Sequence, residues 1–366
     1  MTGANVSGDK KQDRAQIEQA ARAVADRDYP HFRAAVQYAQ DFTTLDQFAF
    51  GTAPSGALLP RYGPARDTQV KNLHDGLDRL EKMIAGMTEV AYRMSVTEAA
   101  NTIDLNSSPK VLVTKPTAPK ATSGGFGALR LGATIGFLYS NWRLCSALKS
   151  SFGVLMPGLI GAGAVTSLLM WATVVPDDNQ IGTVKSAWQM VQSELNSLTG
   201  IHLLDSTGEG ALLPRSAWDD DAREAFDRWV RSFQVELDEA VAAARDGHDA
   251  LDDALDAIHE LHDLMRECDI ATLVALLTLM AASYVPFLTL QARAAQQAIT
   301  IINALATACT VVIMVAEISS YGSMMGLVSD GSRFHELQID NAPDREYGDQ
   351  PVRDTFVDLD IDWLKS

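Results

Sequence analysis

Residues 270–316 constrain the fold of this chain more than any other stretch. They read IATLVALLTLMAASYVPFLTLQA before Arg293 and AAQQAITIINALATACTVVIMVA before Glu317, so each half holds 23 uncharged residues. A helix rises about 1.5 Å per residue, and about 20 apolar residues cross the hydrocarbon core of a bilayer. The polar joint at residues 291–297 would let the two halves fold back on each other. The stretch therefore predicts a hydrophobic helical hairpin.

A third uncharged run covers residues 150–176, which is 27 positions. Gly158, Gly161 and Gly163 in this run allow helices to approach closely, and Pro157 predicts a kink or a break. Two interpretations of the three runs stay open. They insert into a membrane, or they are helices buried on all sides in a large bundle, which their Ala, Thr and Gln content favours.

The composition of the chain limits its partners. The 366 residues include 47 acidic and 30 basic side chains, which gives a formal net charge of -17. The basic side chains are too few to neutralise the phosphates of a ligand, so we expect no nucleic-acid binding and no simple electrostatic docking on anionic lipid. The three cysteines are far apart in apolar or helical contexts and are expected to be buried hydrophobic residues. No apolar segment follows the first positive charges, so we expect no cleavable signal peptide.

Helical periodicity dominates and strand signals are scarce. The sequence therefore predicts an all-α protein, an elongated helical bundle built from two helical-hairpin modules plus hydrophobic helices. The expected units are an N-terminal helical hairpin (1–103), a Pro/Ser/Thr linker (104–127), a hydrophobic helical segment (128–180), a second helical hairpin (181–268), a hydrophobic hairpin (269–328) and an acidic tail (329–366).

In the first module, residues 13–28 and 30–42 are helical in pattern, and Pro30 allows one bent helix or two shorter ones. The segment FAFGTAPSGALLPRYGPA (residues 48–65) is rich in Gly and Pro, which predicts a loop. A helix is expected over residues 66–103, with an apolar stripe that needs a partner. That stripe consists of Val70, Leu73, Leu77, Leu80, Ile84 and Met87.

The second module is expected to contain a helix at residues 181–198 and a very long helix that begins near Trp218. The long helix has no obvious break before the hydrophobic hairpin. Between residues 218 and 269 there are 17 acidic and five basic residues. Phe226, Trp229, Phe233 and Leu237 recur at helical spacing, so this helix is amphipathic with an acidic face that is either solvated or functional.

The hexapeptide GALLPR occurs twice, at residues 56–61 and 210–215. Each copy precedes a long amphipathic helix, which favours two related helix-loop-helix modules. In this interpretation the two leucines close the open end of a hairpin, and the proline ends the loop before the next helix starts.

At the second copy the sequence resembles the WXG (Trp-x-Gly) family, the helical hairpins exported by type VII secretion systems. Trp218 stands where the family has its Trp, and Phe226 and Trp229 follow on the next helix. Asp220 replaces the family's Gly, and no tyrosine is followed four residues later by an acid, which is the family's export signal. The resemblance implies antiparallel helical hairpins, secretion without a cleavable signal peptide and pairing with a helical protein.

No motif of a catalytic site is present: GxSxG, HExxH, a P-loop and a dinucleotide-binding fingerprint are all missing from the sequence. His259 and His262 are three positions apart in a helical pattern, but histidines in an acidic helix are usually solvated rather than metal-bound. We therefore expect no enzyme, no metal and no cofactor.

Three functional hypotheses follow. The first is a secreted or membrane-associated protein with a membrane-active hairpin, such as a pore-forming toxin, whose partner is lipid. The second is a scaffold or partner-binding protein of a secretion system, acting on a helical partner or as a homo-oligomer. The third is a resident membrane protein such as an immunity factor.

Two sets of site residues belong to these hypotheses. The expected partner-binding residues are Trp218, Phe226, Trp229 and Phe233. The expected lipid contacts are Leu155, Leu159, Leu168, Trp171, Leu276, Leu279, Phe287, Ile301, Val311 and Ile313.

Overall fold

The computed structural model describes residues 13–93, 103–118, 175–204, 211–218, 221–283, 333–339 and 356–357. The long helices in these ranges are α1 (Arg14–Phe42), α2 (Thr52–Arg93), α5 (Asp178–Asn196) and α7 (Asp221–Ser283). The short elements are η1 (Leu105–Ser107), α6 (Thr199–His202), η3 (Phe334–Glu336), β1 (Gln338–Ile339) and β2 (Phe356–Val357). The two-residue strands β1 and β2 pair in parallel.

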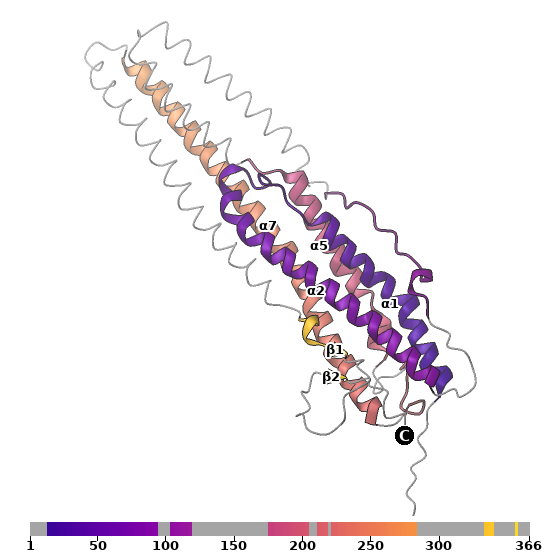
Figure 1. Cartoon of the computed structure of the whole chain (residues 1–366). Coiled ribbons are helices and arrows are strands. Elements are labelled where there is room, and N and C mark those ends of the chain that lie inside the picture. Colours follow the sequence, from indigo (N-terminus) through magenta and orange to yellow (C-terminus); the bar gives the residue numbers. More distant parts are fainter. Residues whose placement is uncertain are drawn as a thin grey trace, which may run out of the picture.

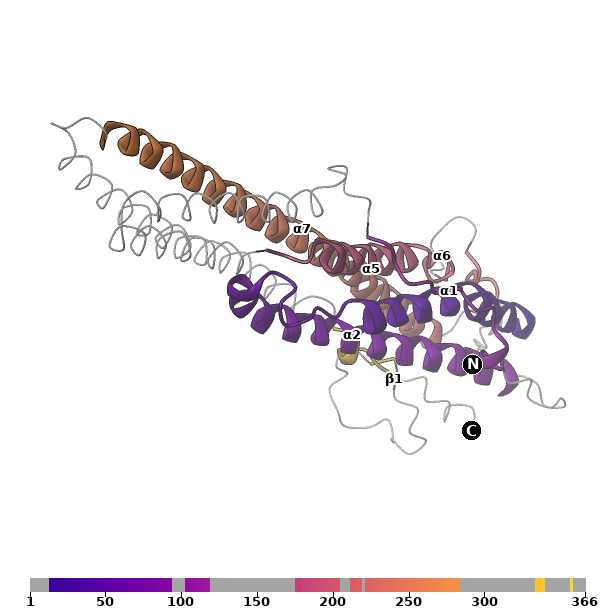
Figure 2. The same cartoon turned by 90° about the horizontal axis from the view of Figure 1, so that it is seen from above.

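The four long helices form an elongated bundle, so the all-α prediction is confirmed (Figures 1 and 2). α1 packs against α2, α5 packs against α7, and α1 joins the two pairs by packing on α5. Contacts between α2 and α7 are sparse, and η3 and β1 lie against α2 at this seam while β2 lies against α7. The bundle therefore has three helix–helix seams and a fourth that short C-terminal elements fill.

α1 is one helix rather than two. The carboxylate of Asp13 caps its first turn by accepting the N–H of Gln16 at 3.3 Å. Pro30 lies inside the helix and is itself buried. A proline in a helix interior removes one backbone hydrogen bond. Here Tyr29 and Phe32 beside it are buried in the core, and this packing holds the helix together across the missing bond.

The predicted loop at residues 48–65 is wrong from Thr52 onward. The connection between α1 and α2 closes at Gly51, whose φ of 85° is in the left-handed region that favours glycine. α2 then starts at Thr52 and continues through Pro60 and Pro64. Leu58, Tyr62 and Ala65 are buried at spacings of four and three, so a buried apolar stripe outweighs the two prolines.

The two GALLPR copies adopt different structures. The first lies within α2, whereas the described part of the second, residues 211–215, is irregular. In the first copy Leu58 is fully buried, and in the second it is the other leucine, Leu213. The hexapeptides therefore do not play one common structural role.

The linker expected at residues 104–127 is non-helical over residues 108–118, as its composition predicts, but it is not a free spacer. The N–H of Thr114 donates to the Tyr38 hydroxyl at 3.3 Å, and the Ser186 hydroxyl donates to the Thr117 carbonyl at 3.1 Å. Ser108 is buried. This part of the linker is packed along the bundle.

Part of the expected acidic tail is also packed. Residues 333–339 lie on the bundle, and Phe334 and Leu337 are buried in its core. Leu337 closes the short helix η3 by donating its N–H to the Phe334 carbonyl at 3.1 Å. This segment of the acidic tail therefore belongs to the packed bundle.

Candidate functional site

The first candidate site is the part of α7 that leaves the bundle. His259 Nε2 and Asp178 Oδ1 lie 2.8 Å apart where α7 passes the first residue of α5. Beyond this point α7 continues to Ser283 and runs past the ends of α1, α2 and α5 (Figures 1 and 2). We call residues 263–283 the α7 extension; at about 1.5 Å per residue it is about 30 Å long. Its last 14 residues, 270–283, carry no charge.

This extension confirms that the long helix runs without a break from the acidic amphipathic region into the first half of the hydrophobic stretch 270–316. Among the helices that the structure describes, none combines the length and apolar composition needed to cross a membrane. Two expected lipid-contacting residues, Leu276 and Leu279, lie in the extension. The other eight lie outside the described residues, as do residues 150–174 and 284–316 of the hydrophobic runs.

The end of the bundle that faces the extension, which we call the projecting end, joins three helices. The backbone N–H of Asp177 donates to the Ala49 carbonyl at 2.7 Å, which ties the start of α5 to the turn between α1 and α2. The Asp177 carboxylate also caps the first turn of α5. Two apolar side chains are exposed at this end, Phe48 at 55% and Val175 at 41%.

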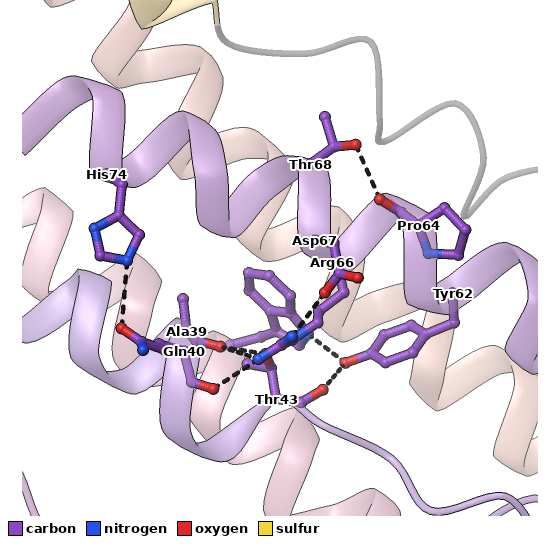
Figure 3. Close-up of polar contacts among 10 residues, drawn as sticks. Ala39, Gln40, Thr43, Tyr62, Pro64, Arg66, Asp67, Thr68 and His74 are labelled. Carbon is purple, nitrogen blue, oxygen red and sulfur yellow. Dashed lines mark hydrogen bonds and ion pairs between the residues drawn. The ribbon is translucent and has the colours of Figure 1, made fainter.

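A polar network fixes the projecting end (Figure 3). Arg66 donates to the Gln40 carbonyl at 2.6 Å and to the Thr43 hydroxyl at 3.0 Å, so its guanidinium satisfies the last turn of α1. The Tyr62 hydroxyl donates to the Thr43 carbonyl at 2.5 Å and accepts the indole N–H of Trp188 at 3.1 Å. Burial raises the pKa of Tyr62, so the hydroxyl keeps its proton for this bond. Three helices thus meet in one hydrogen-bonded cluster.

Polar contacts between partly exposed side chains hold α7 to α5 farther from the projecting end. Lys185 on α5 forms an ion pair with Asp252 on α7. The ring of His248 lies with Nδ1 3.1 Å from the Lys185 carbonyl. These two contacts and the His259–Asp178 pair are arranged in order along the antiparallel helices. The acidic face of α7 is therefore used in part for packing.

The opposite end of α7 is held by buried charges. Arg223 Nε lies 2.7 Å from Asp227 Oδ1, and both side chains are almost completely buried. The guanidinium also donates to the carbonyls of Leu204 and Leu213, at 3.1 and 2.6 Å. It lies 5.7 Å from the ring centroid of Trp218, a cation–π contact. The first turns of α7 are thereby fixed to the connection from α5.

Asp28 supplies a second buried contact in this connection. Its Oδ1 accepts the N–H of Gly200 at 2.9 Å, which caps the short helix α6 from α1. Desolvation by burial raises the pKa of Asp28 from 3.8 to about 6, and the backbone amides of Gly200 and Ile201 partly offset this rise. The contact leaves room only for glycine, because a Cβ on Gly200 would lie 2.2 Å from Asp28 Oδ2.

The four expected partner-binding residues lie in the chain's own core. Trp218 packs on Phe226 with ring centroids 5.4 Å apart, and Trp229 packs on Phe233 at 5.2 Å. None of the four is more than 3% exposed. The two ring pairs belong to one buried core, so in this conformation they are not available to a second protein. Their partner-binding role stays a prediction that requires the bundle to open.

The two histidines considered for metal binding have different surroundings. His259 faces Asp178, as described above, whereas His262 is only 3% exposed. Within the residues that the structure describes, no group of three or more His, Cys, Asp or Glu side chains is placed to hold a metal ion.

Sequence reasoning missed the residues that fix the projecting end and the connection between α5 and α7, namely Asp28, Arg66, Tyr62, Trp188 and Arg223. Only the four-residue spacing of Arg223 and Asp227 carried a sequence signal. Comparison of the chain with protein-family models, with curated proteins and with solved structures gives no match. The geometry of α7 is therefore the main basis for a functional argument.

Proposed function

We propose that this chain is a membrane-active helical protein, in which a packed helical body carries an apolar hairpin that interacts with lipid. The single observation behind the proposal is the continuity of α7 over 63 residues. One helix passes from a body that buries Phe226, Trp229 and Phe233 into an extension whose last 14 residues are uncharged. A rigid helix of this kind couples the body to the hydrophobic runs.

The surroundings of the extension support the same proposal. Phe48 and Val175 are exposed at the projecting end, so apolar side chains accumulate where α7 leaves the body. Burial of apolar surface in lipid or in a partner is favourable in proportion to its area. The acidic residues before the extension oppose an approach to lipid as carboxylates, and protonation removes that cost. We therefore expect membrane interaction to increase at acidic pH.

The resemblance to the WXG family supports the further proposal that this activity belongs to type VII secretion. Supporting features are the antiparallel packing of α5 and α7 and the position of Trp218 just before α7 begins. In this proposal the protein is secreted without a cleavable signal peptide and acts on a membrane. Fractionation of cells distinguishes it from a resident membrane protein, which would need detergent for extraction.

Dye release from lipid vesicles tests the proposal. The full chain should release dye, and more strongly at acidic than at neutral pH. The double variant Leu276→Lys/Leu279→Lys should lose this activity, because each lysine at the centre of a hydrophobic helix costs about 2.5–3.5 kcal/mol on insertion scales. A lysine at Val235, which is 56% exposed on the body part of α7, is the matched control and should leave dye release unchanged. Absence of vesicle binding and of dye release at both pH values would refute the proposal.

A further inference from the structure

The fourth seam of the bundle, between α2 and α7, is filled by a segment far away in the sequence. Residues 333–339 begin 50 positions after the end of α7, yet η3 and β1 lie against α2 at this seam. The backbone N–H of Arg333 bonds to the carboxylate of Glu236 on α7. One short segment thus bridges two helices that touch each other sparingly.

Phe334 is the centre of this bridge. Its ring centroid lies 5.1 Å from that of Phe233 on α7 and 5.8 Å from that of Phe32 on α1. The side chain is completely buried, and three residues later Leu337 is buried as well. The segment therefore presents two apolar anchors in the spacing Phe-x-x-Leu to a groove lined by helices.

The floor of the groove is shaped for an aromatic ring. A Cβ on Gly76 of α2 would lie 2.8 Å from Phe334 Cδ2 and 2.7 Å from Phe32 Cζ. Contacts this short do not occur in real structures, so only glycine at this position admits both rings. Gly63 on the same helix has nothing within 4 Å of an added Cβ, so close approach is a local property of the groove.

We propose that the α2–α7 groove is a peptide-binding site whose ligand is the chain's own segment 333–339, a releasable clasp held by Phe334 and Leu337. Among the described residues, this seven-residue segment contributes two buried side chains, Phe334 and Leu337, whereas each long helix contributes a buried stripe that runs over many turns. A segment with few contacts opens locally at a lower free energy than the whole fold. Release of the clasp leaves the groove open to the same Phe-x-x-Leu pattern supplied in trans. The proposal concerns the body alone and does not depend on lipid.

A labelled synthetic peptide of residues 331–340 tests the proposal on the full chain. The variant Phe334→Ala vacates the groove, so it should bind the peptide at least about tenfold more tightly than the wild type, in which the cis segment competes. A peptide with Ala in place of Phe334 should not bind either chain. The variant Phe334→Ala/Gly76→Val fills the groove and should lose binding, whereas Phe334→Ala/Gly63→Val should keep it. Equal binding to wild type and Phe334→Ala, or none to either, would overturn the proposal.

Native-state hydrogen exchange of the wild type tests the clasp even where Phe334→Ala fails to fold. The amide of Leu337, bonded to the Phe334 carbonyl, should exchange by local opening, with protection at least about tenfold below that of core amides in α1 and α5. A Leu337 amide that exchanges only with global unfolding would mean that the segment does not open on its own, and the proposal would be wrong.

Discussion

Replacing Asp28 with Asn should stabilise the protein at neutral pH and leave it unchanged in acid. Asp28 is completely buried in α1, and its Oδ1 accepts the Gly200 N–H at 2.9 Å. Desolvation raises its pKa from 3.8 to about 6 against the opposing effects of the backbone amides and of Arg27 and His31. Asn keeps the oxygen that accepts this bond and removes the ionisation.

The magnitude follows from the two pKa values. The interval from 3.8 to about 6 corresponds to about 3 kcal/mol, because each pKa unit is worth about 1.36 kcal/mol. Because the pKa of Asp28 is higher in the folded state, ionisation of this carboxyl destabilises the fold. This loss of unfolding free energy is absent below pH 3.8 and grows as the pH rises to about 6. Above that pH it is constant. The free energy of unfolding of Asp28→Asn should therefore exceed that of the wild type by up to about 3 kcal/mol at about pH 8 and by little at about pH 4.

Denaturant unfolding of both proteins across this pH range is the assay. Asp26→Asn is the matched control, because Asp26 lies two positions earlier on α1 and is exposed. Its difference from the wild type should stay within about 0.5 kcal/mol at every pH, as for most surface substitutions. A pH-independent difference between Asp28→Asn and the wild type would refute the assignment of the penalty to Asp28. A loss of stability at neutral pH that disappears in acid would instead show that the charge of the cap outweighs its desolvation.

Three further substitutions test the contacts at the projecting end and at the connection between α5 and α7. Gly200→Ala places a Cβ 2.2 Å from Asp28 Oδ2 and should cost about 1–3 kcal/mol of unfolding free energy, measured by thermal denaturation. Arg223→Met leaves the buried carboxylate of Asp227 without the guanidinium 2.7 Å away, which should cost about 3–5 kcal/mol, and Arg223→Met/Asp227→Leu should recover most of it. Tyr62→Phe removes the hydroxyl that bridges an indole N–H and a carbonyl, so it should cost about 1–3 kcal/mol in denaturant titrations.

Local periodicity was sufficient to predict most of each long helix that the structure describes, and the exception is informative. Residues 48–65 were expected to form a loop because Gly and Pro are frequent there. The buried stripe of Leu58, Tyr62 and Ala65 was already visible at helical spacing, and it prevailed over Pro60 and Pro64. Each proline removes one backbone bond, whereas each buried side chain contributes about 1.5–3 kcal/mol, so packing wins where a core is available.

The contacts that join distant segments could not be predicted from the sequence. Nothing near Asp28 indicates that a carboxylate caps a helix 172 positions later. Nothing near Gly76 indicates that Phe334 packs on it. Such contacts depend on the arrangement of helices, which periodicity does not specify. The aromatic stripe of α7 shows the same limit, because its spacing predicts a buried face but does not identify whether the covering surface belongs to this chain or to another.

The charged contacts of α7 are buried at one end of the helix and exposed toward the other, and this difference determines which part of α7 separates more easily from the body. At the N-terminal end, Arg223 and Asp227 are almost completely buried and bonded to the connection from α5. Toward the projecting end, the side chains of His259 and Asp178 are 27% and 32% exposed, and that of Asp252 is 49% exposed. Exposed ion pairs contribute about 0–1 kcal/mol each, whereas breaking a buried one costs about 3–5 kcal/mol. Separation of α7 from α5 therefore breaks only exposed ion pairs beside the α7 extension, whereas the buried bonds from Arg223 to the Leu204 and Leu213 carbonyls keep the other end of the helix attached to the body.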